Sequence, residues 1–390
     1  MKYLFSLGKN PSLSLAELLA VFGDEKVTLI NNKLALLDIK EIDSGEIIKG
    51  LGGTIKIASL EKTISKPEDL KESCLDLIKQ RSSGQSGKIK FGISPYSKNL
   101  KGFSRLGFEI KKELKKEGIN SRLVTSKEKI LSSVVVETNK LTQSGIEIVL
   151  AKHQNEILLG KTLAVQDFRN LSFRDYNRPA RDSHSGMLPP KLAQILINLA
   201  SLQKKELKLL DPFCGSGTIL TESVLMGYKN IIGTDSSNKA IEDSKTNLKW
   251  VQDNYELNDV NCDLKKIRVE ELSRFFKKES IDIMVTEPYL GPQRGKIQIK
   301  KVVQELETLY SKALEEFSQV LKKGGRIAII WPVFENGTRM IDPNIGQLKL
   351  VPLLKKDFEK DQSLNITKRQ TIIYFREGQK IHREVVVLQK

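Results

Sequence analysis

The spacing of apolar and polar residues changes character near residue 183. Beyond this point, apolar runs of strand length alternate with segments whose apolar residues recur at helical spacing. This alternation predicts a mainly parallel sheet with helices on both faces, as in a Rossmann-like α/β domain. The expected strands are residues 207–211, 231–235, 260–263, 281–287 and 326–332, followed by two or three strands near the carboxyl end that are expected to be antiparallel at the sheet edge.

The first 182 residues combine short strands with helices and predict an α+β region. A helix is expected to begin at Ser14, because Ser14 and Glu17 have the spacing of a capping box. A second helix is expected at 67–79, where apolar residues recur at helical spacing. Residues 134–139 are rich in valine and are expected to form a strand. Residues 166–182 mix charged and aromatic residues without a clear period, which is typical of a linker.

Composition and charge point to a globular chain with an acidic partner. The 390 residues suggest two or three domains, and the formal net charge is +16. Between Lys88 and Lys129 there are twelve basic residues and four glutamates, an excess of eight that accounts for half of the net charge. Such a patch favours nucleic acid as a partner, although part of it is the solvated face of a helix. The lysines of this helix that are expected to contact RNA are Lys111, Lys112, Lys115 and Lys116.

Several other kinds of protein are disfavoured by what the sequence lacks. No apolar run approaches the roughly 20 residues needed to cross a bilayer, and the first residues lack the pattern of a secretion signal, so we expect a cytoplasmic protein. Three cysteines and three histidines are widely scattered. Neither a disulfide framework nor a metal site is therefore expected.

A glycine-containing turn at residues 209–220, LLDPFCGSGTIL, predicts a cofactor site. Gly215 and Gly217 follow the strand that ends at Asp211, and glycine lets the backbone approach a ligand closely. Asp235 and Asp263 are expected at the ends of the next two strands, where carboxylates suit the ribose and base of an adenosine cofactor. A phosphate-binding loop would need a Gly-Lys-Ser or Gly-Lys-Thr sequence, which is missing. Ordinary turns after strands remain the alternative.

The sequence DPFCGSGT resembles motif I of class I methyltransferases that use S-adenosylmethionine to modify amino nitrogens. Together with SHSGMLPPKLAQILINLA and the N-terminal KYLFSLG, LSLAEL and LGGTIKI, it is similar to the THUMP-containing tRNA guanine-N2 methyltransferases. This resemblance implies methylation of the exocyclic amine of guanosine 10 in tRNA, a reaction that requires neither a metal nor a covalent intermediate.

The resemblance also implies a domain plan and a cofactor site. The plan has a ferredoxin-like domain at 1–60, a THUMP domain at 61–165, a linker at 166–182 and the methyltransferase domain at 183–390. The residues expected to bind S-adenosylmethionine are Asp211, Phe213, Gly215, Gly217, Asp235, Asp263 and Gly186.

The segment VTEPYLGPQRGK, residues 285–296, is expected to supply the reacting half of the site. Glu287 would accept a hydrogen bond from the amine, Pro288 would fix the turn, and Tyr289 would stack on the extruded base. Compared with the family's Asp-Pro-Pro-Tyr, the sequence here is Glu-Pro-Tyr-Leu, so the acid is longer and the aromatic residue is displaced. Further RNA contacts are expected from Arg174, Arg178 and Arg294.

Two other functions remain open from the sequence. One is an amino-methyltransferase acting on DNA or RNA adenine, on ribosomal RNA guanine or on a protein glutamine, since the same site serves these reactions. The other is a tRNA-binding protein whose catalysis is impaired by the altered Glu-Pro-Tyr-Leu sequence. The sequence does not decide between one and two added methyl groups, and it does not show whether a small activating subunit is needed.

Overall fold

The protein divides into two compact units, seen in a computed structural model. The structure describes residues 1–83, 87–97, 103–181, 187–257, 261–292, 298–334, 337–354, 358, 361–376 and 378–390. Unit 1 comprises residues 1–11 and 22–168, and unit 2 comprises residues 12–21 and 169–390. Each unit is described separately below.

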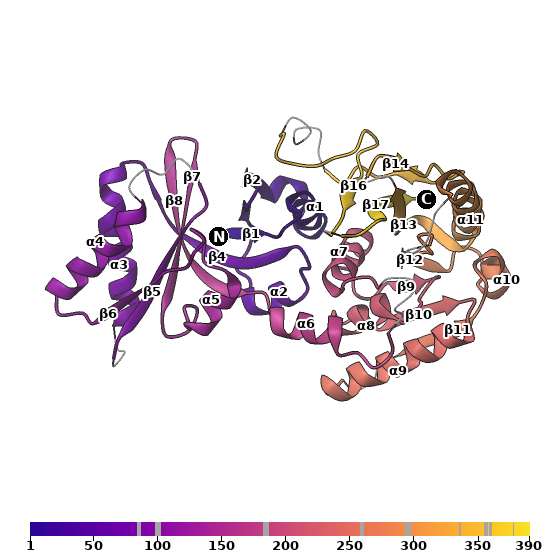
Figure 1. The fold of residues 1–390 in the computed structure, drawn as a ribbon, viewed down its shortest axis with the longest axis horizontal. Coiled ribbons are helices and arrows are strands. Elements are labelled where there is room, and N and C mark those ends of the chain that lie inside the picture. Colours follow the sequence, from indigo (N-terminus) through magenta and orange to yellow (C-terminus); the bar gives the residue numbers. More distant parts are fainter. Residues whose placement is uncertain are drawn as a thin grey trace. The chain divides into compact units, whose positions relative to one another are not determined.

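The described residues of unit 1 form one sheet of eight strands in the order β2-β3-β1-β4-β8-β7-β5-β6 (Figure 1). Most neighbours are antiparallel, and β5 is parallel to both β6 and β7. The strands are β1 (Lys2–Leu7), β2 (Val27–Asn31), β3 (Leu34–Asp38), β4 (Thr54–Ile64), β5 (Ile89–Pro95), β6 (Ser121–Val124), β7 (Ile146–His153) and β8 (Glu156–Val165). The helices of this unit are α2 (Ser44–Lys49), α3 (Leu70–Ser82), α4 (Phe103–Lys116) and α5 (Ser133–Thr138).

Strand β4 joins the two halves of this sheet. It pairs with β1 on one side and with β8 on the other. Lys56 of β4 forms a buried ion pair with Glu147 of β7, with 2.6 Å between Nζ and Oε1. The other oxygen of Glu147 accepts a hydrogen bond from Thr162 at 2.7 Å, so the buried charges are compensated by polar contacts. The domain boundary expected at residue 60 therefore falls within a strand of a continuous sheet.

Unit 2 contains a mixed sheet in the order β11-β10-β9-β12-β13-β17-β15, with β14 paired to β13 and β16 to β17. Its strands are β9 (Lys208–Asp211), β10 (Asn230–Asp235), β11 (Cys262–Lys266), β12 (Ile281–Thr286), β13 (Leu321–Phe334), β14 (Arg339–Met340), β15 (Lys349–Leu350), β16 (Ile372–Tyr374) and β17 (His382–Gln389). Neighbours from β11 to β13 are parallel, and β17 is antiparallel to β13. The expected parallel sheet with antiparallel strands toward its carboxyl-terminal side is confirmed.

Two groups of helices pack together in unit 2. α7 (Pro190–Ser201), α8 (Thr218–Leu225) and α9 (Asn238–Asn254) lie side by side, and α10 (Leu272–Phe275) contacts α11 (Ile299–Val320) (Figure 1). The chain order reverses between β9 and β12, which are neighbours in the sheet. Loops diverge at such a switch point, so the carboxyl ends of β9 and β12 flank the natural place for a ligand.

Three local predictions differ from the structure. α1 runs from Pro11 to Phe22, so Ser14 and Glu17 lie inside the helix and form no capping box. The valine-rich residues 134–139 fall mostly in helix α5, because Ser132 caps it by accepting a hydrogen bond from the Val135 amide at 3.3 Å. The expected linker contains α6 (Phe168–Tyr176).

Helix α1 contributes a buried polar contact to unit 2. Residues 12–21 belong to this unit, and Asn198 of α7 donates a hydrogen bond to the fully buried carboxylate of Glu17 at 2.8 Å. The Ser12 hydroxyl accepts a second hydrogen bond from the Asn365 amide at 2.8 Å. Part of the N-terminal region is thus integral to the fold of the C-terminal unit.

Replacing Glu17 should therefore destabilise unit 2. We expect Glu17→Ala to lower its free energy of unfolding by about 1–3 kcal/mol, because a buried acceptor is removed. Both tryptophans, Trp250 and Trp331, lie in unit 2, so urea unfolding followed by tryptophan fluorescence reports on this unit. Glu46→Ala in unit 1, which breaks an exposed ion pair to Lys49, is the control and should leave the tryptophan transition unchanged. Equal transitions for both variants would contradict this role of α1.

Candidate active site

The glycine bend after β9 adopts a conformation that favours glycine. Gly215 and Gly217 have φ values of 52° and 81°. A Cβ atom on Gly217 would lie 2.9 Å from the Ser244 Oγ atom and 3.2 Å from the Ser244 Cα atom. Because part of this obstacle is backbone, a side chain at Gly217 would push the bend away from α9. Gly217 is also the residue immediately before the first turn of α8.

Asp235 and Asp211 hold this bend and its surroundings. Asp235, at the end of β10, accepts hydrogen bonds from the backbone amides of Gly215 at 3.1 Å and Ser237 at 2.9 Å. Asp211, at the end of β9, accepts one from the Phe213 amide at 3.2 Å. The Thr286 hydroxyl, at the end of β12, donates to the same Asp211 oxygen at 2.7 Å. The two predicted acids thus connect three neighbouring strand ends.

A cavity of about 580 Å³ opens at these strand ends. It brings together the glycine bend, both acids and the loop after β12, which are separated by up to 78 positions in the sequence. Its lining includes Met187, Asp211, Phe213, Gly215, Asp235, Ser237, Arg268, Glu270, Glu287, Pro288, Tyr289 and Leu309. The volume lies within the range of small-molecule and cofactor sites. The loop predicted to carry the catalytic residues and most of the predicted cofactor residues therefore line one cavity.

Burial changes the protonation of Asp211. Desolvation raises its pKa to about 7, the charges of Asp235 and Glu287 add to this, and the hydrogen bonds from Thr286 and Phe213 oppose it. Since the pKa lies above its ordinary value of 3.8, the folded protein binds a proton that the unfolded chain releases. This stabilising contribution is complete below the unfolded pKa and is lost as the pH rises through about 7.

Asp211→Asn should remove this dependence, because the amide oxygen still accepts from Thr286 but the side chain carries no charge. Between about pH 5 and pH 8 we expect the variant to gain about 2 kcal/mol of stability relative to the wild type. Urea unfolding followed by tryptophan fluorescence over this pH range measures the difference. Stability curves that stay parallel across the range would show that Asp211 does not titrate as described.

The loop after β12 presents Glu287 at the cavity in an ion pair. The Nε atom of Arg383, on β17, lies 2.6 Å from Oε1 of Glu287, and the Nη2 atom lies 3.5 Å from Oε2. Pro288 is buried, whereas the side chain of Tyr289 is 51% exposed. The buried hydroxyl of Tyr310 on α11 donates to the Tyr289 carbonyl at 3.2 Å and fixes the loop. Burial, with the charge of Glu287, raises the pKa of Tyr310 and keeps it a donor.

The structure corrects the position of Asp263. It lies near the start of β11 rather than at its end, pairs in register with Ile232 and forms an exposed ion pair with Lys265. It is absent from the cavity lining. Arg268 and Glu270, just after β11, line the cavity instead. The missed signal was the continuation of the strand through Leu264 to Lys266, which moves its carboxyl end past Asp263.

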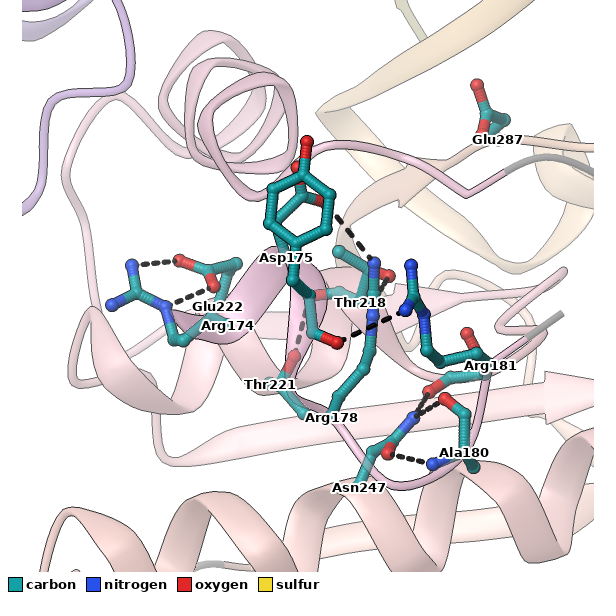
Figure 2. A network of polar contacts seen from close by, with 12 residues as sticks. Arg174, Asp175, Arg178, Ala180, Arg181, Thr218, Thr221, Glu222, Asn247 and Glu287 are labelled. Carbon is teal, nitrogen blue, oxygen red and sulfur yellow. Dashed lines mark hydrogen bonds and ion pairs between the residues drawn. The ribbon is translucent and has the colours of Figure 1, made fainter. Parts of the chain in front are cut away.

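Two arginines predicted to contact RNA have partners inside unit 2 (Figure 2). Arg174 forms a bidentate pair with the buried carboxylate of Glu222, at 2.7 and 3.0 Å. Arg178 is only 5% exposed and donates to the Thr218 hydroxyl at the start of α8. Neither guanidinium is presented to a phosphate, and the two side chains attach α6 and the segment that follows it to α8. The prediction is corrected for both residues, because burial and internal pairing replace solvent exposure.

The remaining predicted residues fall into two groups. Lys111, Lys112, Lys115 and Lys116 are exposed on α4 of unit 1, and Lys116 pairs with Glu113 at 3.0 Å. Gly186 and Arg294 lie outside the described residues.

Among the described residues, no cluster of three or more His, Cys, Asp or Glu side chains is arranged to hold a metal ion. None of the described helices is long and apolar enough to span a membrane.

Comparison with known families places a methyltransferase domain in unit 2. Residues 177–349 match the family described as RMKL-like, methyltransferase domain. Residues 93–246 match a family described as DNA methylase. The fold is shared with the crystal structure of TrmN from Thermus thermophilus, with a TM-score of 0.54, 18% identity and 100% of each chain covered.

Sequence relatives carry a more specific name. The chain is 24% identical over 339 residues to the tRNA (guanine(10)-N2)-dimethyltransferase of Pyrococcus abyssi, covering 85% of this chain and 88% of that protein. It is 29% identical over 172 residues to the protein of the same name from Methanothermobacter thermautotrophicus, covering 43% of this chain and 45% of the relative. It is also 29% identical over 187 residues to the protein of the same name from Methanocaldococcus jannaschii, covering 45% of this chain and 48% of that relative. The matched region thus spans about half the length of these last two relatives.

Proposed function

We propose that the protein is an S-adenosylmethionine-dependent tRNA methyltransferase that modifies the exocyclic N2 amine of a guanosine, at position 10. The observation that carries this proposal is the shared cavity, in which Glu287 and Tyr289 face the same space as the glycine bend and Asp235. The name of the relatives in Pyrococcus abyssi and Methanothermobacter thermautotrophicus supports the choice of nucleotide.

The cofactor half of the cavity fits S-adenosylmethionine, which when bound supplies a methyl group on a positively charged sulfur. Gly215 and Gly217 let the backbone approach a ligand, and a Cβ on Gly217 would meet Ser244. Asp235 is held at the end of β10, where a carboxylate suits the ribose hydroxyls. Arg268 and Glu270 extend the lining beyond β11, on the side where the adenine would lie. Phe213 lines the cavity beside the bend.

The other half of the cavity fits an aromatic amine. The lone pair of the guanine N2 amine is delocalised into the ring, so orientation is the main task of the protein. The Glu287 carboxylate can accept a hydrogen bond from the amine and stabilise the positive charge that develops on nitrogen. Tyr289, half exposed at the cavity, offers a face for stacking the extruded base. The proton lost from the methylated nitrogen passes to solvent.

Unit 1 is proposed to bind the tRNA. It carries the four exposed lysines of α4, together with a groove of about 1390 Å³ in which Lys33, Lys129 and Lys152 are exposed. Phe108, 62% exposed, also lines this groove and is available for stacking on a base. Within this unit we propose a ferredoxin-like part at residues 1–60 and a THUMP part at 61–165, joined through β4.

A second candidate is methylation of the adenine N6 amine. It is favoured by the match of residues 93–246 to a DNA methylase family. The same carboxylate and aromatic face would orient an adenine amine, so the cavity alone does not distinguish the two bases. The basic unit 1 and the near full-length alignment with the Pyrococcus abyssi relative favour the guanine of tRNA.

Mass spectrometry of the product tests the proposal. The purified protein is incubated with deuterated S-adenosylmethionine and unmodified tRNA transcript, and the RNA is digested to nucleosides. We expect labelled N2-methylguanosine or N2,N2-dimethylguanosine. Labelled N6-methyladenosine would favour the second candidate, and the absence of any labelled nucleoside would contradict both.

A further inference from the structure

Glu287 forms an ion pair with Arg383, a residue that belongs to none of the motifs found in the sequence. Arg383 lies on β17, 96 residues after Glu287, and the strand β13 separates β17 from β12 in the sheet. Neighbouring strands are about 4.8 Å apart, so the two side chains must together span roughly 10 Å. Arg383 pairs in register with Pro332, three positions beyond the row of Thr286, so it overhangs the carboxyl end of β12.

The geometry of the pair distinguishes the two oxygens of Glu287. Oε1 accepts the hydrogen bond from Nε at 2.6 Å, whereas Oε2 is 3.5 Å from Nη2. The Nη1 atom of Arg383 is engaged by the side-chain oxygen of Gln379 at 3.3 Å, which fixes the plane of the guanidinium. A carboxylate oxygen carries two lone pairs, so Oε2 keeps acceptor capacity toward the cavity.

The guanidinium of Arg383 and the carboxylate of Glu287 are both shielded from water, so their ion pair can fix the orientation of the carboxylate. The side chains of Arg383 and Glu287 are 4% and 11% exposed. Burial alone lowers the pKa of Arg383, but attraction to Glu287 and the hydrogen bond between them outweigh it, and the pKa ends raised. Removing one member of a buried pair leaves the other charge uncompensated. The pair also limits the net negative charge of a cavity that already contains Asp211 and Asp235.

We propose that Arg383 is a positioning residue for methyl transfer, which fixes the Glu287 carboxylate so that Oε2 points at the acceptor amine. A glutamate has one more rotatable bond than an aspartate, and the fork of the guanidinium removes that freedom. The length of Glu287 is matched to this partner, because an aspartate would end about 1.5 Å short of it. This inference rests on the proposed function and adds a residue that acts through Glu287 without touching the substrate.

A double-substitution cycle on the full-length protein tests the inference. Arg383→Gln and Glu287→Asp are each expected to lower kcat about 100-fold, since a displacement of about 1 Å is enough for such a loss. The KM for tRNA transcript and the Kd for S-adenosylhomocysteine should stay within about threefold of the wild type. The combined variant should lose no more than either single variant, because both break the same contact. Arg383→Lys, which keeps the charge without the fork, should retain part of the activity.

Controls separate positioning from folding. Arg339→Gln makes the same change of charge at an exposed residue of β14 and should leave kcat unchanged. Tryptophan fluorescence confirms that each variant is folded in unit 2. Adding methylguanidine to Arg383→Ala should restore part of kcat, whereas methylamine should not.

The outcomes are distinguishable. An active wild type with an unchanged kcat in Arg383→Gln, or losses in the two single variants that multiply in the combined variant, would overturn the inference alone. A folded wild type that transfers no methyl group to tRNA would overturn the proposed function and this inference together.

Discussion

Glu287→Gln is expected to reduce kcat for tRNA methylation by about 10³-fold, the upper range for removing one charged group that stabilises a transition state. The amide keeps the shape of the side chain but presents no negative charge to the amine, and it leaves the Arg383 cation uncompensated beside the developing positive charge. The measurement is the initial rate of methyl incorporation into tRNA transcript. Calorimetry with S-adenosylhomocysteine, run in parallel, should show nearly unchanged cofactor binding.

The matched control for this prediction is Glu315→Gln. Glu315 is exposed on α11 of the same unit, so the substitution makes the same chemical change away from the cavity. Its kcat should equal that of the wild type. If Glu287→Gln retained more than about a tenth of the wild-type rate, the assignment of this carboxylate to the acceptor amine would be wrong.

Gly217→Ala is expected to weaken binding of S-adenosylhomocysteine by at least about 100-fold, which corresponds to about 2.7 kcal/mol. Two effects combine, because the residue has a φ of 81° and its new Cβ would lie 2.9 Å from the Ser244 Oγ atom. The bend that carries Gly215 would shift away from α9 and from Asp235. Isothermal titration calorimetry measures the loss directly.

Gly324→Ala separates the two effects. Gly324 has a φ of 75°, close to that of Gly217, but a Cβ atom there meets nothing within 4 Å. The two substitutions share the backbone strain, and only Gly217→Ala adds the collision with α9. Cofactor binding should be normal in Gly324→Ala, and equal weakening in both variants would show that the packing of the bend is not what shapes the cavity.

The parts of the site that the sequence predicted are those tied to strand ends. Asp211 and Asp235 follow apolar runs, and parallel strands bring their carboxyl ends to one edge, so the order of the runs was enough to place these acids together. The sequence predicts Asp263 at the end of its strand, because the lysines that follow it do not continue an apolar run, although β11 extends to Lys266. An edge strand with only one strand neighbour needs no continuous apolar run, and its boundaries are hard to read.

Contacts between distant segments could not be predicted in this way. Arg383 reaches Glu287 across β13, and nothing in the spacing of the two residues in the chain links them. The sequence predicts an exposed RNA contact at Arg174, because a charged side chain gives no sign that Glu222, 48 residues away, is buried and opposite in charge. Residues 133–138 form helix α5 where the sequence predicts a strand, because valine favours strands whereas the cap at Ser132 stabilises the helix.

The measurement that tests the central claim most directly compares two tRNA molecules that differ by one amino group. One carries guanosine at position 10, and the other carries inosine there, which lacks the exocyclic N2 amine. Incubation with labelled S-adenosylmethionine should transfer methyl groups to the first tRNA and none to the second, while both compete equally for binding. Equal incorporation into the two molecules would contradict the account, because the methyl group would then be going to another atom.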